Sequence, residues 1–263
     1  MTEQNLPPWG ADPLSVFFSD AEHNDRVSSL NLPLVYTLLQ RVHTTLQRCD
    51  ETIEKDNRDE LLVTRFLIVR THSAFLASIR LAMSGQVFEA YPVLRAAIEQ
   101  AWYALHIAKD PHPPKRAKLW LCRNDDVASK AACKSEFMVA KVRSTHESLD
   151  VATARQLQEL YEDMIDFGGH PNQLGVLTSV SKLQEEKQIT YRIGILHPGT
   201  VAQIFVLRMA AAVAVGALKI FQLVFPERFR IMGIDSEIHA LVNEVNTVFK
   251  PYVPKVREAG TTG

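Results

Sequence analysis

One arginine and one glutamate stand in the middle of an apolar segment, residues 86–110, QVFEAYPVLRAAIEQAWYALHIAKD. Between Glu89 and Lys109, the only formally charged residues are Arg95 and Glu99. Their spacing of four residues places both on one face of a helix, in the order that is less favourable for a mutual ion pair. We therefore expect Arg95 and Glu99 to reach other helices or a ligand, because buried charges need partners or a task. The alternative is a buried structural network that fixes helix register.

The preceding segment supplies cations without local counter-ions. Residues 61–88 contain no acidic side chain. They do contain several basic ones, Arg65, Arg70, His72 and Arg80. We expect Arg70 and Arg80 to join Arg95, Glu99 and the later His170 in a cluster that binds a small anion or a nucleotide phosphate. The alternative counter-ions are acidic residues of the chain itself, Glu159, Glu162, Asp163 and Asp166.

Three further residues have the types that acid–base and phosphate chemistry use. His170 follows two glycines, so a turn positions it, and Asp163 and Asp166 are near enough in sequence to orient its ring. The alternative is a surface histidine that caps a helix. Arg192 and His197 have four residues between them, and His197 precedes a proline at the start of a long helix, where backbone N–H groups favour anions. His170, Arg192 and His197 are therefore the candidate catalytic residues.

Composition excludes several classes of protein. The chain has 263 residues, is 46% hydrophobic and 22% charged, and carries a net charge of -1, which is typical of a globular protein without a broad nucleic-acid surface. Three scattered cysteines without metal-ligand spacing favour reduced thiols in the cytoplasm. Phosphate-loop, dinucleotide-binding, hydrolase-elbow and zinc-protease signatures are missing. We expect no metal site and no cofactor.

Targeting and membrane segments are also not expected. The N-terminal sequence lacks a basic start followed by an apolar run, so no signal peptide is predicted. The most apolar segment, 201–225, is interrupted by Arg208 and Lys219. A bilayer span needs about 20 apolar residues. We interpret 201–225 as a buried helix of a soluble protein, without a membrane partner.

The apolar spacing predicts an all-α chain, a multi-helix bundle with a small β-hairpin insertion near 174–195. The predicted helices cover residues 32–56, 59–83, 86–110, 115–123, 125–145, 150–166, 198–225 and 235–249. Gly85 is the expected C-terminal cap of the second helix. The hairpin strands are predicted from two β-prone runs, 174–180 and 188–195.

The domain organisation follows from these elements. Residues 1–28 are predicted to be an irregular arm with a short helix near 13–18. Residues 29–250 form one α-helical domain, because no linker is long enough to separate two. Residues 251–263 form a loose tail.

A family resemblance adds to this reading. Residues 70–107 resemble uncharacterised bacterial proteins of the HEPN-like helical superfamily, which have a long helix, a glycine-containing turn and then a helix with Arg-x-x-x-Glu, here Arg95 to Glu99. A later Tyr…His-Pro element is matched by Tyr161 and His170. The similarity covers roughly residues 60–225. It implies an all-α bundle, frequent homodimers, and links to phage defence or toxin–antitoxin systems.

The resemblance also frames the functional hypotheses. Some members of the superfamily are metal-independent ribonucleases that use Arg-x(4–6)-His at a dimer interface. Arg192…His197 and Arg65…His72 both have that spacing in this chain. The leading hypothesis is a cytoplasmic HEPN-like homodimer that binds a small anion or nucleotide phosphate at the arginine, glutamate and histidine cluster. The alternatives are a ribonuclease that acts on RNA and a non-enzymatic interaction module.

Overall fold

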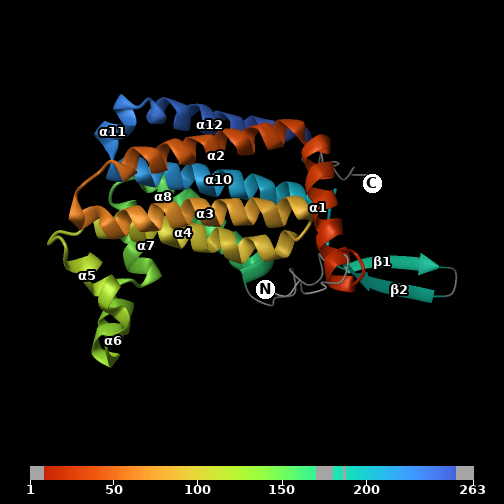
Figure 1. The fold of residues 1–263 in the computed structure, drawn as a ribbon, viewed down its shortest axis with the longest axis horizontal. Coiled ribbons are helices and arrows are strands. Elements are labelled where there is room, and N and C mark those ends of the chain that lie inside the picture. The colour runs from red at the N-terminus through yellow and green to blue at the C-terminus, as the bar shows by residue number, and fades with distance from the viewer. Residues whose placement is uncertain (1–8, 170–179, 186–187, 253–263) are drawn as a thin grey trace, which may run out of the picture.

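Three long helices form the centre of an all-α bundle (Figure 1). The computed structural model describes residues 9–169, 180–185 and 188–252. Helices α3 (Leu62–Ser84) and α4 (Val87–Ala108) make an antiparallel hairpin, and α10 (Val201–Val224) packs against both. Helix α10 is apolar on nearly every side, and its many alanines allow neighbouring helices to approach closely.

Outer helices enclose this centre. They are α1 (Pro13–Asn31), α2 (Pro33–Glu54), α8 (Val151–Met164) and α12 (Ile234–Val248). Helix α2 packs between α3 and α12, while α1 crosses one end of the bundle (Figure 1). The predicted all-α bundle is therefore confirmed.

Shorter elements connect the long helices. They are η1 (Asp59–Leu61), α5 (Lys115–Leu121), η2 (Cys122–Asn124), α6 (Val127–Glu136), α7 (Val139–Glu147), the π-helical η3 (Ile165–Gly169), α11 (Pro226–Ile231) and η4 (Lys250–Tyr252). Helices α5 and α6 protrude at one corner, opposite the end crossed by α1 (Figure 1).

The β-insertion is a two-stranded antiparallel hairpin that extends away from the bundle (Figure 1). Strand β1 (Val180–Glu185) pairs with β2 (Gln188–Ile193), with Val180 opposite Ile193. The hairpin is confirmed, and its first strand as described covers Val180–Glu185, whereas the strand was predicted at 174–180. Residues 174–179 lie outside the described part of the chain.

The predicted irregular arm at 1–28 is wrong for its second half. Helix α1 runs to Asn31, far beyond the short helix expected near 13–18. Asp12 accepts hydrogen bonds from the N–H groups of Leu14 and Ser15, and the Ser15 hydroxyl accepts the N–H of Asp12 in return. This capping box is a strong start signal that the sequence already contained. Farther along the helix, Ser28 Oγ donates to the Met83 carbonyl at 3.0 Å, which docks α1 on the bundle.

The single helix predicted over 125–145 is also wrong. The chain forms α6 and α7 instead, with Met138 in an extended conformation between them. The preceding residue, Phe137, is buried and packs its ring against Tyr103 and His106 of α4. Burial of the Phe137 ring thus favours a break between α6 and α7, although the local helix propensity alone predicts one continuous helix.

Two segments of the described chain are long and apolar enough to cross a bilayer, Asp59–Ser84 and Val201–Val224. Core helices of soluble bundles have the same length and composition. In this fold the most apolar window is 50% buried in the first segment and 72% buried in the second. The expected absence of a membrane segment stays a prediction.

Gly85 performs the predicted capping role and also allows a close backbone contact. It ends α3 in the left-handed conformation, with φ 96°, and its carbonyl accepts the His197 N–H at 2.7 Å. A Cβ atom at this position would lie 2.9 Å from the backbone nitrogen of His197. The turn between α3 and α4 therefore depends on glycine for two separate reasons.

This double requirement gives the first testable prediction. Gly233 also has positive φ, 67°, but a Cβ there would meet no atom within 4 Å. Gly233→Ala should cost about 1–2 kcal/mol of unfolding free energy from backbone strain alone. Gly85→Ala should cost a further ~1–3 kcal/mol because the methyl group forces the backbone near His197 to move. Urea unfolding of both variants measures the difference, and equal losses would contradict the steric argument.

Candidate functional site

The predicted pair on α4 is joined to helix α8 and not to the arginines of α3. Arg95 Nε lies 3.3 Å from Glu99 Oε1, and each side chain is 31% exposed. The Tyr161 hydroxyl donates to Glu99 at 2.7 Å, and its ring lies 5.7 Å below the Arg95 guanidinium carbon. The two charges do reach another helix, as expected, because both contact Tyr161 of α8. They also pair with each other, which their order on the helix did not favour.

The two α3 arginines of the expected cluster lie elsewhere. Arg70 and Arg80 are exposed, and Arg80 makes an ion pair with Asp25 of α1. The face of α3 that enters the core carries residues such as Ile68 and Phe75 instead. The structure therefore does not assemble the predicted anion cluster from Arg70, Arg80, Arg95 and Glu99.

The candidate catalytic residues have different outcomes. His170 lies outside the described residues, and Arg192 is on β2 with a side chain that is not described. His197 is half-buried, with its ring packed edge-on against Phe88 at 5.2 Å. The α10 N-terminus near it is capped by Thr200, whose hydroxyl accepts the Gln203 N–H at 3.2 Å. His197 thus has an anchoring role at this junction.

The second Arg-x-x-x-x-x-x-His spacing also does not converge on one site. Arg65 donates to the backbone carbonyl of Asp56. The Nδ1 atom of His72 instead lies 2.6 Å from Asp50 Oδ2. Although both residues lie on one face of α3, their side chains contact different groups: Asp50 within α2 and Asp56 beyond the end of that helix.

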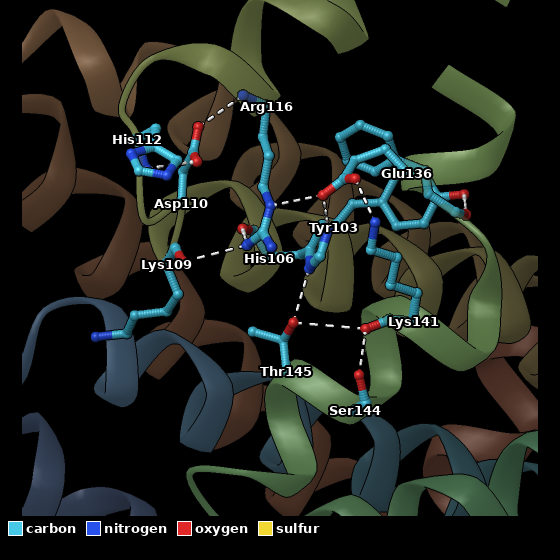
Figure 2. Close-up of polar contacts among 11 residues, drawn as sticks. Tyr103, His106, Lys109, Asp110, His112, Arg116, Glu136, Lys141, Ser144 and Thr145 are labelled. Carbon is cyan, nitrogen blue, oxygen red and sulfur yellow. Dashed lines mark hydrogen bonds and ion pairs between the residues drawn. The ribbon is translucent and has the colours of Figure 1, made fainter. Parts of the chain in front are cut away.

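A polar cluster at the end of α4 centres on Glu136 (Figure 2). Glu136 Oε1 accepts from Arg116 Nε at 2.8 Å and lies 3.2 Å from His106 Nε2, while Oε2 accepts from Lys141. His106 is fully buried, and its Nδ1 lies 2.7 Å from the hydroxyl oxygen of Thr145. Side chains from α4, α5, α6 and α7 therefore meet at one carboxylate.

This Glu136 cluster has the features of a structural junction. Arg116 also donates to the carbonyls of His106 and Lys109 at 2.7 and 3.1 Å, which satisfies the end of α4 (Figure 2). Burial would raise the pKa of Glu136, but the hydrogen bonds from Lys141 and Arg116 outweigh it and lower the pKa to about 2. Each charged group of the cluster has a partner, so the cluster holds the α5–α7 segment and leaves little for a ligand.

A chain of three titratable groups joins α2 to α3, and sequence reasoning did not identify it. Asp50 Oδ2 lies 2.6 Å from His72 Nδ1, and His72 Nε2 lies 2.9 Å from His43 Nδ1. When His72 Nδ1–H donates to Asp50, its Nε2 can accept from His43 Nδ1–H, and the Nε2 atom of His43 then carries a lone pair. Burial and then the charge of His72 lower the pKa of His43, against the opposing effect of Asp50.

This His43–His72–Asp50 chain is a hydrogen-bonded link between α2 and α3, and the Asp50 side chain at its end is 23% exposed. The signal in the sequence was the seven-residue spacing of His43 and Asp50 on one face of α2. Among the described residues, His43 has no hydroxyl or thiol nucleophile within hydrogen-bond distance. The described contacts therefore support a polar connection between α2 and α3 and give no reaction partner for these histidines.

The structure also contains a groove that sequence reasoning did not find. It has a volume of about 400 Å³ and lies along α10 between α8 and α12. Its apolar middle is formed by Leu157, Leu160, Met209, Ala212, Val215, Val242 and Val245. Leu157 and Gly216 are in close contact, since a Cβ at Gly216 would lie 2.6 Å from Leu157 Cδ2. The glycine brings α8 onto α10 and so sets the depth of the groove.

The two ends of the groove differ in charge. At one end, Lys219 Nζ lies 3.2 Å from Thr153 Oγ1. Lys219 is half-buried, and among the described residues no carboxylate lies within 4.0 Å of its amine. The other end is lined by Arg208 together with two acidic residues of α8, Glu159 and Asp163. The eleven-residue spacing of Arg208 and Lys219, about three turns, was the available sequence signal.

Two neighbours show how the charge of Lys219 acts at its end of the groove. It helps to lower the pKa of Asp150, whose carboxylate is already used to accept the Thr153 N–H at the start of α8. Burial and then Lys219 lower the pKa of His146 to about 4, so this histidine is neutral near pH 7. Trp102 Nε1 donates to His146 Nδ1 at 3.1 Å, which leaves Nε2 as a buried donor without an acceptor in the described structure.

No protein family, curated protein or solved structure matches this chain. Within the described residues, no group of three or more His, Cys, Asp or Glu side chains is arranged to hold a metal ion. The groove and its charged ends are therefore the features on which a function can be argued.

The Glu136 cluster gives a prediction on acid stability. A carboxyl whose pKa is about 2 in the folded chain and about 4.3 when unfolded stabilises the fold above the higher value. That stability is lost as the pH falls from about 5 toward 2. Glu136→Gln should cost about 1–3 kcal/mol at pH 7, because three donors lose a charged acceptor. Urea unfolding at pH 7, 5 and 3 should show the difference from wild type shrinking with pH.

The matched control for this experiment is Glu147→Gln. Glu147 is exposed on α7, close to the cluster in sequence but outside it. Its substitution should change stability by less than about 0.5 kcal/mol at any of these pH values. A constant difference between wild type and Glu136→Gln at pH 7 and pH 3 would refute the role given to this carboxylate.

Proposed function

We propose that the chain binds an amphipathic organic anion in the groove between α8, α10 and α12. The ligand class is a carboxylate or phosphate attached to an apolar body. The observation that carries the proposal is the half-buried Lys219 amine, which ends an apolar groove without a carboxylate within 4.0 Å in the described chain. Lys219 is partly buried and its charge acts on Asp150 only from a distance, so a ligand anion would supply the direct ion pair that the described chain does not.

The size and lining of the groove support a small organic ligand. Its volume of about 400 Å³ falls in the range of roughly 300–1,000 Å³ that is typical of ligand sites. Such sites are mostly apolar and contain a few polar groups that fix orientation. Here the aliphatic middle would hold the apolar body, and Lys219 with Thr153 would hold the charged group.

The charges at the ends favour one orientation of the ligand. Burial first, and then the nearby charges of Asp166, Glu159 and Glu162, raise the pKa of Asp163. This shift marks a concentration of negative charge at the end that contains Arg208. An anion is therefore favoured at the Lys219 end, and Arg208 serves to balance the acidic residues of α8.

The proposal keeps the small-anion hypothesis and moves it to different residues. Membership of the HEPN-like superfamily, the cytoplasmic location and the homodimer remain predictions. The ribonuclease alternative relies on His170 and Arg192, whose side chains are outside the described structure. The described geometry of His197 favours an anchoring role and adds no support to RNA cleavage.

Calorimetric titration tests the groove with four ligands of one chain length: octanoate, octyl phosphate, octanol and octylamine. The two anions should bind most tightly. Lys219→Met should weaken octanoate binding about 10- to 100-fold, as expected for loss of a charge-assisted hydrogen bond of about 1.5–3 kcal/mol. The control Lys130→Met removes an exposed lysine of α6 and should leave binding unchanged.

A second variant separates the groove from any other binding site. Ala212 lies in the middle of the groove and is half-buried. Ala212→Phe should fill the space and abolish binding of all four ligands while the far-UV circular dichroism is retained. Equal affinity for octanoate and octanol, or octanoate binding that survives both substitutions, would show that the proposal is wrong.

A further inference from the structure

The β-hairpin presents an unusual row of exposed apolar side chains. Ile189, Tyr191 and Ile193 alternate along β2, so they share one face of the strand. They are 49%, 66% and 70% exposed, and Ile195 just beyond the strand is 70% exposed. Single exposed apolar residues are ordinary, but a row on one strand marks an interaction surface.

The hairpin also lacks the support that such strands need. It extends away from the bundle, and in the described chain no third strand pairs with it (Figure 1). An isolated two-stranded hairpin is at best marginally stable in water, whereas three or more strands with an apolar face are stable. The open edge of β2 is a template for another strand.

The pattern of β2 identifies the kind of strand that fits. Residues 189–193 are Ile-Thr-Tyr-Arg-Ile. The apolar and polar positions are arranged symmetrically about Tyr191, so the pattern is the same in both chain directions. Antiparallel pairing of two copies about Tyr191 places Ile189 opposite Ile193 of the second copy. If the twofold axis moves by one residue toward the N-terminus, to Thr190, Ile193 comes opposite Lys187 of the second copy. Among registers that pair Ile189, Tyr191 and Ile193 only with residues of β2, the arrangement centred on Tyr191 is the one that sets all three against apolar residues.

We propose that two copies of this chain associate through antiparallel pairing of β2 with β2, about a twofold axis at Tyr191. The product is a four-stranded sheet in the order β1-β2-β2-β1, with the isoleucines and tyrosines of both copies on one face. Cross-strand aliphatic and aromatic pairs stabilise such sheets. A twofold contact is closed, so association stops at the dimer. The proposal is independent of the ligand groove, which lies within one chain.

Cysteine cross-linking tests the register directly. The exposed Cys122 is first replaced by serine, since Cys49 and Cys133 are buried. Directly opposed residues of antiparallel strands have Cα atoms about 4.5–5.5 Å apart, within the roughly 4.4–6.8 Å that a disulfide needs. Tyr191→Cys should therefore form a disulfide-linked dimer under mild oxidation at micromolar concentration.

The flanking positions provide a matched control. Ile189→Cys alone should not cross-link, because position 189 lies about 13 Å along the strand from its own image at ~3.3 Å per residue. Ile193→Cys alone should not cross-link for the same reason. A mixture of the two variants should cross-link. Self-linking of either variant, or failure of both Tyr191→Cys and the mixture, would overturn the proposed pairing.

Sedimentation equilibrium tests the association without a cross-link. Wild type should be a dimer at tens of micromolar, and Ile193→Lys should weaken association at least tenfold. The control Val127→Lys replaces an apolar residue of α6 that is 86% exposed, and it should remain a dimer. A monomeric wild type, or a dimer unaffected by Ile193→Lys, removes the proposal. Sedimentation of a monomeric wild type with anionic phospholipid vesicles, lost in Ile193→Lys, would assign the row to a membrane instead.

Discussion

The close packing of α10 against α3 and α4 is the constraint on which the rest of the structure depends. Helix α10 is apolar on nearly every side, so it can be stable only if other helices cover it. Gln203 is its buried polar exception, and it donates to Ser28 Oγ and to the Ala82 carbonyl, both at 2.9 Å. That one amide joins α10 to the first helix and to the end of α3. The outer helices then take positions that the central three leave open.

The ligand groove is a consequence of how α10 is covered. Helix α8 lies directly against it at Gly216, and α12 lies on the other side. The side chains between them are too small to fill the remaining space, so the apolar groove stays open to solvent. Lys219 enters this groove because its neighbours on α10 are buried and its position on the helix faces α8. A binding site thus arises where close helix packing and incomplete coverage meet.

Charged side chains in this fold are satisfied locally, at the surfaces where helices meet. Glu99 uses Arg95 and Tyr161, while Glu136 uses Arg116 and Lys141. Both arrangements follow from the cost of burying an unpaired charge. The groove lysine differs from them in lacking such a partner. The apolar row on β2 also lacks a partner, because the bundle does not cover these side chains. The binding proposal rests on the groove lysine, and the association proposal rests on the apolar row of β2.

The sequence by itself determined the class of the fold, most helix bounds, the Gly85 cap and the existence of the hairpin. Apolar periodicity, prolines and capping residues act over a few residues, so they can be recognised without distant contacts. The start of α1 was equally available in the capping box at Asp12. Tertiary structure decided which helix faces meet. It separated Arg80 from Glu99, broke the chain at Met138 so that Phe137 could be buried, and brought His43 to His72. It also created the groove at Lys219, because the rotation of each helix depends on packing against segments far away in the sequence.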